Sequence, residues 1–505
     1  MSAELERLAA TCLFPGFPGL EPPGWILRRL GQGLGGVVLY ARNVADGDQL
    51  GRLTEALRAE RSDVLVAIDE EGGDVTRLEA ATGSSYPGNA ALGAVDDVEL
   101  TGQVAAAMGA DLADAGVNLD LAPVADVNTN PLNPIIGIRS FGSDPELVAR
   151  HVAAFVRGLQ GVGVAACAKH FPGHGDTYED SHLELPTVPV DRETFFDQAL
   201  PPFRAAIEAG ALSIMTAHIL VPALDDVPAT TSRAILHDLL RNELGFEGLV
   251  MTDALEMRAI SDTIGVEEGA VRALEAGADA LCLGHDLADD AVASIQRAIV
   301  DAVVSGRLPE ARLAEAAERV RVTAERAVRR PGADPTGPDT GLRRATGRTA
   351  ARRAVRTEGE PVLTRAPLIV DLEPRPSIAA GESRGPGEWL RRALPAAELV
   401  RVGEDDAGAP EPDGRQLVVI ARDAHRHAWQ RETLDALLAQ SDDAIVVEVG
   451  LPTWLPGGGR GYVATYGAAR VNLDAAAEIL AGNAEPGLYS RPRRGVEQSG
   501  SSPGS

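Results

Sequence analysis

The stretch VGVAACAKHFPGHGDTYEDSH, residues 162–182, carries the clearest sign of the fold. Its first part, 162–171, is almost continuously apolar until it reaches Lys169 and His170. Such a run is typical of a parallel β-strand buried on both faces, because helices cover both sides of a parallel sheet. The stretch then turns into a glycine-bearing segment rich in histidine and aspartate, so polar groups gather where the predicted strand ends.

Similar apolar runs recur along the first two thirds of the chain, at 8–17, 35–41, 64–70, 117–126, 211–219, 248–255 and 278–286. Between them lie segments with apolar residues at i, i+3 and i+4 spacing, among them 46–62, 146–163 and 195–211, which predict amphipathic helices. Eight strands alternating with helices predict an α/β fold in which residues 1–325 form a (β/α)8 TIM barrel.

The remaining chain predicts a smaller second domain. Residues 326–360 are rich in arginine and glycine and are interpreted as a solvated linker with helical flanks. Apolar runs at 367–372, 416–423 and 444–450, with an amphipathic helix at 426–440, predict a small αβα domain over 361–490. The polar, Gly/Ser-rich residues 491–505 are predicted to be a disordered tail.

Composition argues against several classes of partner. The net charge is 47 − 74 = −27, which repels nucleic acid and anionic membranes, so neither is expected as a partner. Cys12, Cys167 and Cys282 lie in apolar runs and outside any C-x-x-C pair, which favours reduced thiols and a cytoplasmic location. We also expect no signal peptide, no membrane span and no nucleotide cofactor, because none of the corresponding sequence patterns is found.

Polar residues stand at or just after the ends of several predicted strands, and a TIM barrel keeps its chemistry at the carboxyl ends of its strands. They are therefore expected to meet at one mouth of the barrel. These residues are Asp69, Arg139, Lys169, His170, His218 and Asp253. His218 is expected either to line the pocket or only to pack at the end of the sixth strand.

These residues also lie in motifs that resemble a known family. The string KHFPGHGDTYEDSH (169–182) is similar to the signature of the β-N-acetylglucosaminidase branch of glycoside hydrolase family 3. The stretches IDEEGGDVTRL (68–78), VNLDLAPVADVNTNPLNPIIGIRSFGSDP (117–145) and VMTDALEM (250–257) resemble further family motifs in the same order. The resemblance covers about residues 10–330 and implies retaining removal of a terminal β-linked N-acetylglucosamine. Asp74 departs from it, because a basic or neutral residue is more usual there.

The resemblance also implies roles for individual residues. Asp253 matches the nucleophile, His182 the acid/base, and Asp180 the partner of His182. The sugar-binding residues are matched by Asp69, Arg77, Arg139, Lys169 and His170. The residue types suit these roles, since a carboxylate can form a covalent glycosyl intermediate and an Asp-bound histidine can exchange protons near neutral pH. Gly173 and Gly175 predict a pliable loop that swings His182 into place.

Two alternatives stay open at this point. A histidine acid/base does not repel an anion, so inorganic phosphate could replace water as the acceptor and make the enzyme a phosphorylase. A metal-dependent TIM-barrel hydrolase would instead need a ligand set, to which His170, His174, Asp176, Asp180 and His182 could contribute. Pro172 and Gly173 oppose the helical register that His170 and His174 would then need, so no metal is expected. Peptidoglycan fragments and chito-oligosaccharides both remain possible substrates, and a cytoplasmic site would favour peptidoglycan recycling.

Overall fold

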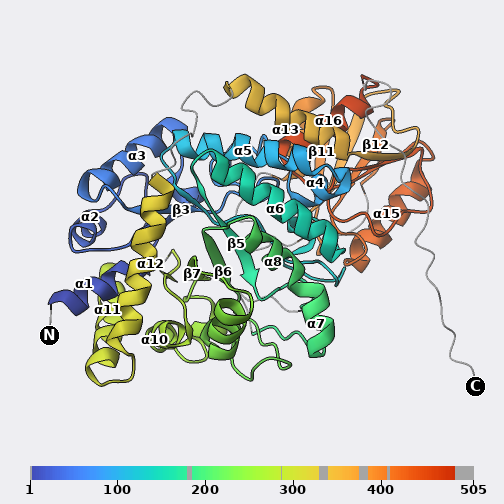
Figure 1. The fold of residues 1–505 in the computed structure, drawn as a ribbon. Helices are drawn as coiled ribbons and strands as arrows, with labels where there is room; N and C mark the ends of the chain where they lie inside the picture. The colour runs from blue at the N-terminus through green and yellow to red at the C-terminus, as the bar shows by residue number, and fades with distance from the viewer. Residues whose placement is uncertain are drawn as a thin grey trace, which may run out of the picture.

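The computed structural model describes residues 3–178, 185–285, 287–328, 339–374, 385–406 and 410–483. In Figure 1 a barrel surrounded by helices lies beside a smaller orange-to-red unit formed by the later part of the chain. The first unit confirms the (β/α)8 barrel predicted from the apolar runs, and the second has the αβα layers expected of a small parallel sheet.

The barrel wall consists, within the described residues, of eight short parallel strands. Strands β2 to β7 pair in sequence order, β1 pairs with β8, and the ring closes through the Met251–Ala280 bridge and the hydrogen bond from Val38 N to Pro15 O. Every strand residue is buried, which explains the continuous apolar runs. The strands are β1 (Leu13–Phe14), β2 (Gly36–Leu39), β3 (Leu65–Ile68), β4 (Leu119–Asp120), β5 (Ala165–Phe171), β6 (Ser213–Thr216), β7 (Leu249–Thr252) and β8 (Leu281–Cys282).

Helices surround this wall, and several begin at an aspartate whose side chain accepts a backbone N–H of the first turn, as Asp46, Asp97 and Asp144 do. Helices α5 and α6 pack against each other across one side of the barrel (Figure 1). The helices are α1 (Ala3–Thr11), α2 (Gly24–Gly31), α3 (Gly47–Glu60), α4 (Asn89–Val95), α5 (Val98–Asp114), α6 (Pro145–Gly161), α7 (Arg192–Ala199), α8 (Pro201–Glu208), α9 (Arg258–Ser261), α10 (Val266–Ala276), α11 (Asp289–Val304) and α12 (Glu310–Val328), with short 3-10 turns η1 (Ala41–Asn43), η2 (Gly137–Arg139) and η3 (Ala229–Thr231) and the π-helix η4 (Ala234–Glu243).

The amino-terminal end of the barrel is held by a buried aspartate. Asp279 precedes β8, is fully buried, and forms ion pairs with Arg241 at 2.5 Å, Arg312 at 2.7 Å and Arg319 at 3.2 Å. These arginines come from η4 and α12, so the cluster ties two outer helices to the start of a strand. In a TIM barrel this end serves stability rather than chemistry.

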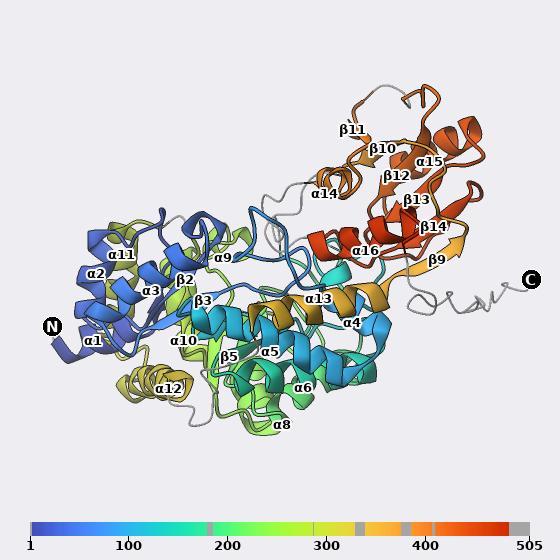
Figure 2. The ribbon, with the colours of Figure 1, turned by 90° about the horizontal axis from the view of Figure 1, so that it is seen from above.

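The second unit is a six-stranded sheet in the described residues, with β9 alone antiparallel. Its order is β11-β10-β12-β13-β14-β9, with β9 (Arg356–Gly359), β10 (Pro367–Leu372), β11 (Glu398–Val402), β12 (Gln416–Ala421), β13 (Ile445–Glu448) and β14 (Gly461–Ala464). Helices α14 (Pro386–Ala393) and α16 (Arg470–Leu480) pack on one face, and α15 (Ala428–Gln440) packs on the other. Figure 2 shows this unit beside the barrel, with α16 close to α13 (Thr340–Ala354).

Most of the predicted linker, 326–360, is folded onto the two units. Residues 329–338 lie outside the described residues, but α13 and β9 follow them. Arg343 of α13 forms ion pairs with Asp111 at 2.9 Å and Asp114 at 2.6 Å, both on α5. The arginines expected to be solvated therefore bind barrel carboxylates. The limits 1–325 and 361–490 stay predictions, and the predicted tail 491–505 lies outside the described residues.

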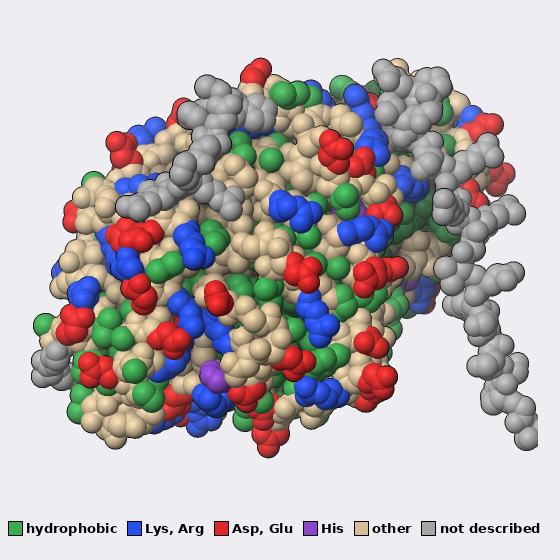
Figure 3. Space-filling view, viewed as in Figure 1, with side chains coloured by type: hydrophobic (Ala, Val, Ile, Leu, Met, Phe, Trp, Pro, Cys, Tyr) green, Lys and Arg blue, Asp and Glu red, His purple; other side chains and the backbone are tan. Residues whose placement is uncertain are grey.

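The surface view is consistent with a protein whose charges are dispersed. Figure 3 shows acidic and basic side chains interspersed over the helices on this face, without one large patch of a single sign. In the part of the chain that the structure describes, no helix combines the length and the apolar character needed to cross a bilayer. Cys12, Cys167 and Cys282 are free and buried.

Candidate active site

Several of the predicted site residues lie at the carboxyl ends of their strands. Asp69 directly follows β3, Lys169 lies near the end of β5, and Asp253 directly follows β7. The Nζ atom of Lys169 donates a hydrogen bond to Asp69 Oδ1 at 2.6 Å. The fold therefore brings residues from distant parts of the sequence to one mouth of the barrel, as predicted for this architecture.

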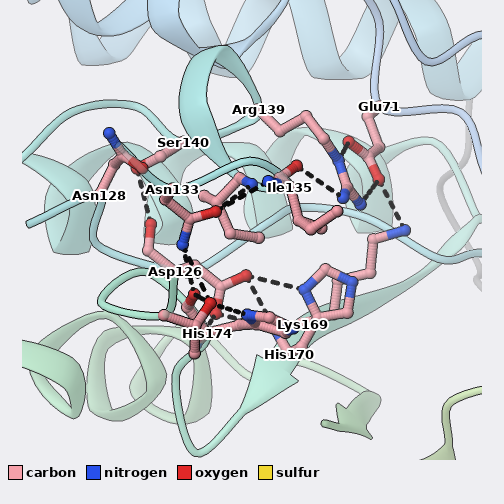
Figure 4. Close-up of polar contacts among 12 residues, drawn as sticks. Glu71, Asp126, Asn128, Asn133, Ile135, Arg139, Ser140, Lys169, His170 and His174 are labelled. Atoms are coloured by element: carbon pink, nitrogen blue, oxygen red, sulfur yellow. Dashed lines mark hydrogen bonds and ion pairs between the residues drawn. The ribbon is translucent and has the colours of Figure 1, made fainter. Parts of the chain in front are cut away.

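A buried carboxylate that the sequence analysis missed connects two of the predicted sugar ligands. Glu71 is 3 % exposed; it lies 2.8 Å from Lys169 Nζ and accepts hydrogen bonds from Arg139 Nε at 2.9 Å and Nη2 at 2.7 Å (Figure 4). Burial by itself raises the pKa of Glu71, but Arg139 and Lys169 outweigh it and hold the pKa well below the usual range. Glu71 is therefore ionised and fixes both cations.

Arg77 approaches the same cluster from the loop after β3. Its Nη2 atom lies 3.9 Å from Asp69 Oδ2. Asp69 therefore has Lys169 at Oδ1 and Arg77 near Oδ2. The backbone N–H of Arg77 donates to Glu70 Oε2 at 2.8 Å. Burial raises the pKa of Glu70 to about 7. Of the consecutive acids 69–71, two face the cations and Glu70 caps the backbone of the returning loop.

His170 is oriented by a second carboxylate that the sequence analysis missed. Its Nδ1 atom lies 2.7 Å from Asp126 Oδ2, and Asp126 is fully buried (Figure 4). Burial by itself raises the pKa of Asp126, but the neighbouring His170 outweighs burial and lowers the pKa. The carboxylate is therefore ionised and accepts a hydrogen bond from His170 Nδ1. This bond fixes the ring and turns Nε2 away from Asp126. Asp126 follows a predicted strand like the other site residues, which was the available signal.

The described part of the loop after β5 is firmly held. His174 N–H donates to Asp126 Oδ1 at 2.6 Å, and Asn133 Nδ2 donates to the His174 carbonyl at 2.8 Å. A Cβ on Gly175 would lie 1.7 Å from the Val127 carbonyl oxygen, so this glycine allows two backbones to touch. In this structure Gly175 serves close backbone packing, and the pliability expected from Gly173 and Gly175 stays a prediction.

His174 is a buried histidine of this loop. It is 2 % exposed, with Nδ1 2.8 Å from Thr177 Oγ1. Burial lowers the pKa of His174 to about 4, so the ring is neutral at physiological pH. Asp180 and His182, the expected acid/base pair, lie outside the described residues.

The segment after β7 is fixed by His218. Asp253 is half-buried, and its Oδ1 accepts the Ala254 N–H at 2.8 Å. His218 follows β6, is 1 % exposed, and its Nε2 donates to the Ala254 carbonyl at 3.0 Å, while Nδ1 lies 2.7 Å from Thr230 Oγ1. Of the two roles expected for His218, this arrangement favours packing and orientation of the backbone beside Asp253.

The metal alternative gains no support from the side chains in view. Within the described ranges, no group of three or more His, Cys, Asp or Glu side chains is arranged to hold a metal ion. Asp126 engages His170, Thr177 engages His174, and Asp176 accepts from Thr129 Oγ1 at 3.2 Å. Asp180 and His182, the other two residues of that alternative, lie outside the described residues.

The chain is similar to two curated β-hexosaminidases. It is 41 % identical over 269 residues to "Beta-hexosaminidase A" of Pseudoalteromonas piscicida, over 49 % of this chain and 45 % of that protein. It therefore spans less than half of that relative. It is 37 % identical over 275 residues to "Beta-hexosaminidase" of Nitrosomonas eutropha, over 52 % of this chain and 78 % of the relative.

A solved structure extends the likeness to the second unit. A glycoside hydrolase family 3 β-N-acetylglucosaminidase from Paenibacillus sp. str. FPU-7 is 34 % identical, with a TM-score of 0.83, over 95 % of this chain and 97 % of that one. The family model described as the glycosyl hydrolase family 3 N-terminal domain matches residues 30–323, which contain the whole cluster at the barrel mouth. The resemblance recognised in the sequence motifs is confirmed, and the chain belongs to glycosyl hydrolase family 3.

Proposed function

We propose that the protein is a retaining exo-β-N-acetylglucosaminidase that removes terminal β-linked N-acetylglucosamine. The observation that carries the proposal is the ion-pair cluster at the barrel mouth, where Lys169 contacts both Asp69 and Glu71. Such groups suit the hydroxyls of one pyranose ring, because each can donate or accept in a fixed direction. The likeness to two β-hexosaminidases and to a β-N-acetylglucosaminidase supports the same activity.

In the proposed mechanism the sugar is held by five side chains, Asp69, Arg77, Arg139, Lys169 and His170. Asp253 attacks the anomeric carbon as a carboxylate while His182, assisted by Asp180, protonates the leaving oxygen, so the glycosidic bond breaks and a glycosyl ester forms. His182 then takes a proton from water, which attacks the same carbon and releases Asp253. Two displacements retain the anomeric configuration.

The substrate class belongs to the same proposal. Terminal N-acetylglucosamine occurs on peptidoglycan fragments and on chito-oligosaccharides, and we propose these as the natural substrates. Three free, buried cysteines favour a reducing compartment, so we propose a cytoplasmic location, which fits recycling of peptidoglycan fragments. No observation favours phosphate over water as the acceptor.

A direct test is turnover of an aryl N-acetyl-β-glucosaminide by the whole chain and by Asp253→Asn. We expect the variant to lose at least about three orders of magnitude in kcat, since the nucleophile is removed. Asp301→Asn, on the outer helix α11, is the matched control and should retain full activity. Products formed with and without phosphate separate the two acceptors: free N-acetylglucosamine supports hydrolysis, and N-acetylglucosamine 1-phosphate would overturn it. An active Asp253→Asn would overturn the nucleophile assignment.

A further inference from the structure

The loop that follows β3 begins with a tight turn whose tip is Asp74. The Glu71 N–H donates to the Val75 carbonyl at 3.0 Å, and Gly72 and Gly73 have φ values of +74° and +64°, a region that favours glycine. Gly73 N–H also donates to the Tyr86 carbonyl at 2.9 Å. Glu71 and Asp74 are therefore two ends of one short, constrained turn.

Asp74 is bound by the second unit on both of its carboxylate oxygens. Its Oδ1 accepts the Ala468 N–H at 2.8 Å, and its Oδ2 lies 2.5 Å from Arg422 Nη2. Arg422 directly follows β12, and Ala468 lies in the segment after β14. Residues at the carboxyl edge of the second sheet thus bind the turn at the barrel mouth. The family departure at Asp74 has a structural counterpart in this contact.

The two partners of Asp74 are themselves fixed within the second unit. The Arg422 N–H donates to Gln430 Oε1 at 3.0 Å, and Gln430 Nε2 donates back to the Arg422 carbonyl at 3.1 Å. Gln430 is fully buried in α15. Beside Ala468, the Gly467 carbonyl accepts from Thr465 Oγ1 at 2.8 Å. The two partners of Asp74, Arg422 and Ala468, are therefore held in place by hydrogen bonds within the second unit.

The far end of the same loop is held by the second unit as well. Arg470, the first residue of α16, donates from Nε to the Thr82 carbonyl at 3.0 Å and from Nη2 to Ser85 Oγ at 2.5 Å. The Val471 N–H donates to the Ser84 carbonyl at 3.2 Å. The loop from Asp69 to Ser85 is thus clamped between the units at its tip and at its end.

We propose that Asp74 and Arg422 are positioning residues through which the second unit fixes the sugar-binding face of the barrel. Their contact holds the turn, the turn holds Glu71, and Glu71 holds Lys169 and Arg139. The kinetic part of this inference rests on the proposed function. It gives the second unit a task in sugar binding without placing any of its atoms on the substrate.

The test is a charge reversal and its compensation. Arg422→Asp sets two carboxylates against each other and should raise KM for an aryl N-acetyl-β-glucosaminide roughly tenfold, with kcat changed less than about threefold. Amide hydrogen exchange over residues 69–78 should become faster in the same variant. The double variant Asp74→Arg with Arg422→Asp should recover part of the KM. Arg365→Gln, which breaks an ion pair with Asp443 inside the second unit, is the control and should leave KM and exchange unchanged.

The outcomes separate this inference from the proposed function. Unchanged KM and unchanged exchange in a folded Arg422→Asp would overturn the positioning role, as would a folded double variant that is no better than the single one. If Arg422→Asp does not fold, Arg422→Gln gives the same comparison without repulsion. A wild type that turns over no N-acetyl-β-glucosaminide would refute the proposed function, whereas hydrogen exchange over 69–78 would still support or refute the positioning role.

Discussion

Replacing Glu71 by glutamine tests whether the cluster at the barrel mouth is organised before substrate arrives. Glutamine has nearly the same shape but loses the negative charge and puts an amide N–H2 in place of one oxygen. Glu71 makes three close contacts, at 2.7 and 2.9 Å with Arg139 and at 2.8 Å with Lys169. Glu71 Oε1 receives two of these contacts, from Arg139 Nη2 and Lys169 Nζ, and Oε2 receives the one from Arg139 Nε. A glutamine whose oxygen takes the Oε1 position therefore keeps two contacts without their charge, and the third becomes donor facing donor.

The magnitude follows from these contacts. A hydrogen bond to a charged group contributes about 1.5–3 kcal/mol, so one lost contact and two weakened ones predict about 3 kcal/mol, the low end of the 3–5 kcal/mol typical when one partner of a buried pair is removed. Lys169 keeps Asp69, and Arg139 keeps the Ile135 carbonyl at 3.3 Å, so we expect about 3 kcal/mol in total. If half of it acts on the site, kcat/KM falls about tenfold; the other half lowers the Tm of a barrel of this size by about 2 °C.

The assay compares Glu71→Gln with Asp279→Asn. Both remove one buried charge that holds several cations, but Asp279 lies at the amino end of the barrel. Thermal unfolding and kcat/KM on an aryl N-acetyl-β-glucosaminide are measured for each. We expect both variants to lose stability and only Glu71→Gln to lose kcat/KM. A folded Glu71→Gln with wild-type kcat/KM, or an equal loss in Asp279→Asn, would show that Glu71 does not organise the site.

Three further predictions follow from other parts of the structure. Asp126→Asn should lower kcat/KM roughly tenfold or more on the same substrate, because His170 loses the ionised acceptor that orients its ring; wild-type kinetics would contradict this role. Gly175→Ala should abolish most activity, because the added Cβ would lie 1.7 Å from the Val127 carbonyl oxygen, while a near-wild-type rate would show that the loop can shift. Burial raises the pKa of Glu448 from 4.5 to about 8, so the folded state binds this proton more tightly and the free energy of unfolding falls as pH rises from about 4.5 to 8. In Glu448→Gln, chemical unfolding should show a fall in the free energy of unfolding that is at least about 1 kcal/mol smaller over that range. A pH profile equal to that of the wild type would refute the shift.

The barrel was predictable because both faces of its strands are buried, which leaves continuous apolar runs in the sequence. The same reasoning could not separate strand from helix in every run. The apolar stretch 8–17 belongs partly to α1, which extends to Thr11, and only Leu13–Phe14 form β1. Strand β9, Arg356–Gly359, has the sequence RTEG and lies at a sheet edge, so it carries no apolar signal and was included in the predicted linker.

The site was predictable at the level of strand ends and unpredictable at the level of side-chain direction. Asp69, Glu70 and Glu71 are consecutive acids, and the sequence does not tell which of them faces the cations. The answer depends on the turn at Gly72 and Gly73, which returns the chain so that Glu70 meets backbone N–H groups and Glu71 meets Arg139. Likewise, the contact between Asp74 and Arg422 joins residues more than 300 positions apart, which no local pattern reports.

The arrangement suits the proposed binding of a neutral sugar by ion-paired groups in a strongly acidic chain. Unpaired buried charges would be unstable and would change protonation instead of binding hydroxyls. Here Lys169 is shared by Asp69 and Glu71, and His170 is paired with Asp126, so each predicted ligand reaches the mouth with its charge balanced and its direction set. Groups that are already oriented need little rearrangement when the sugar binds, so more of each interaction is available to the transition state. The partners of the sugar ligands, Glu71 and Asp126, should therefore affect catalysis although neither needs to touch the substrate.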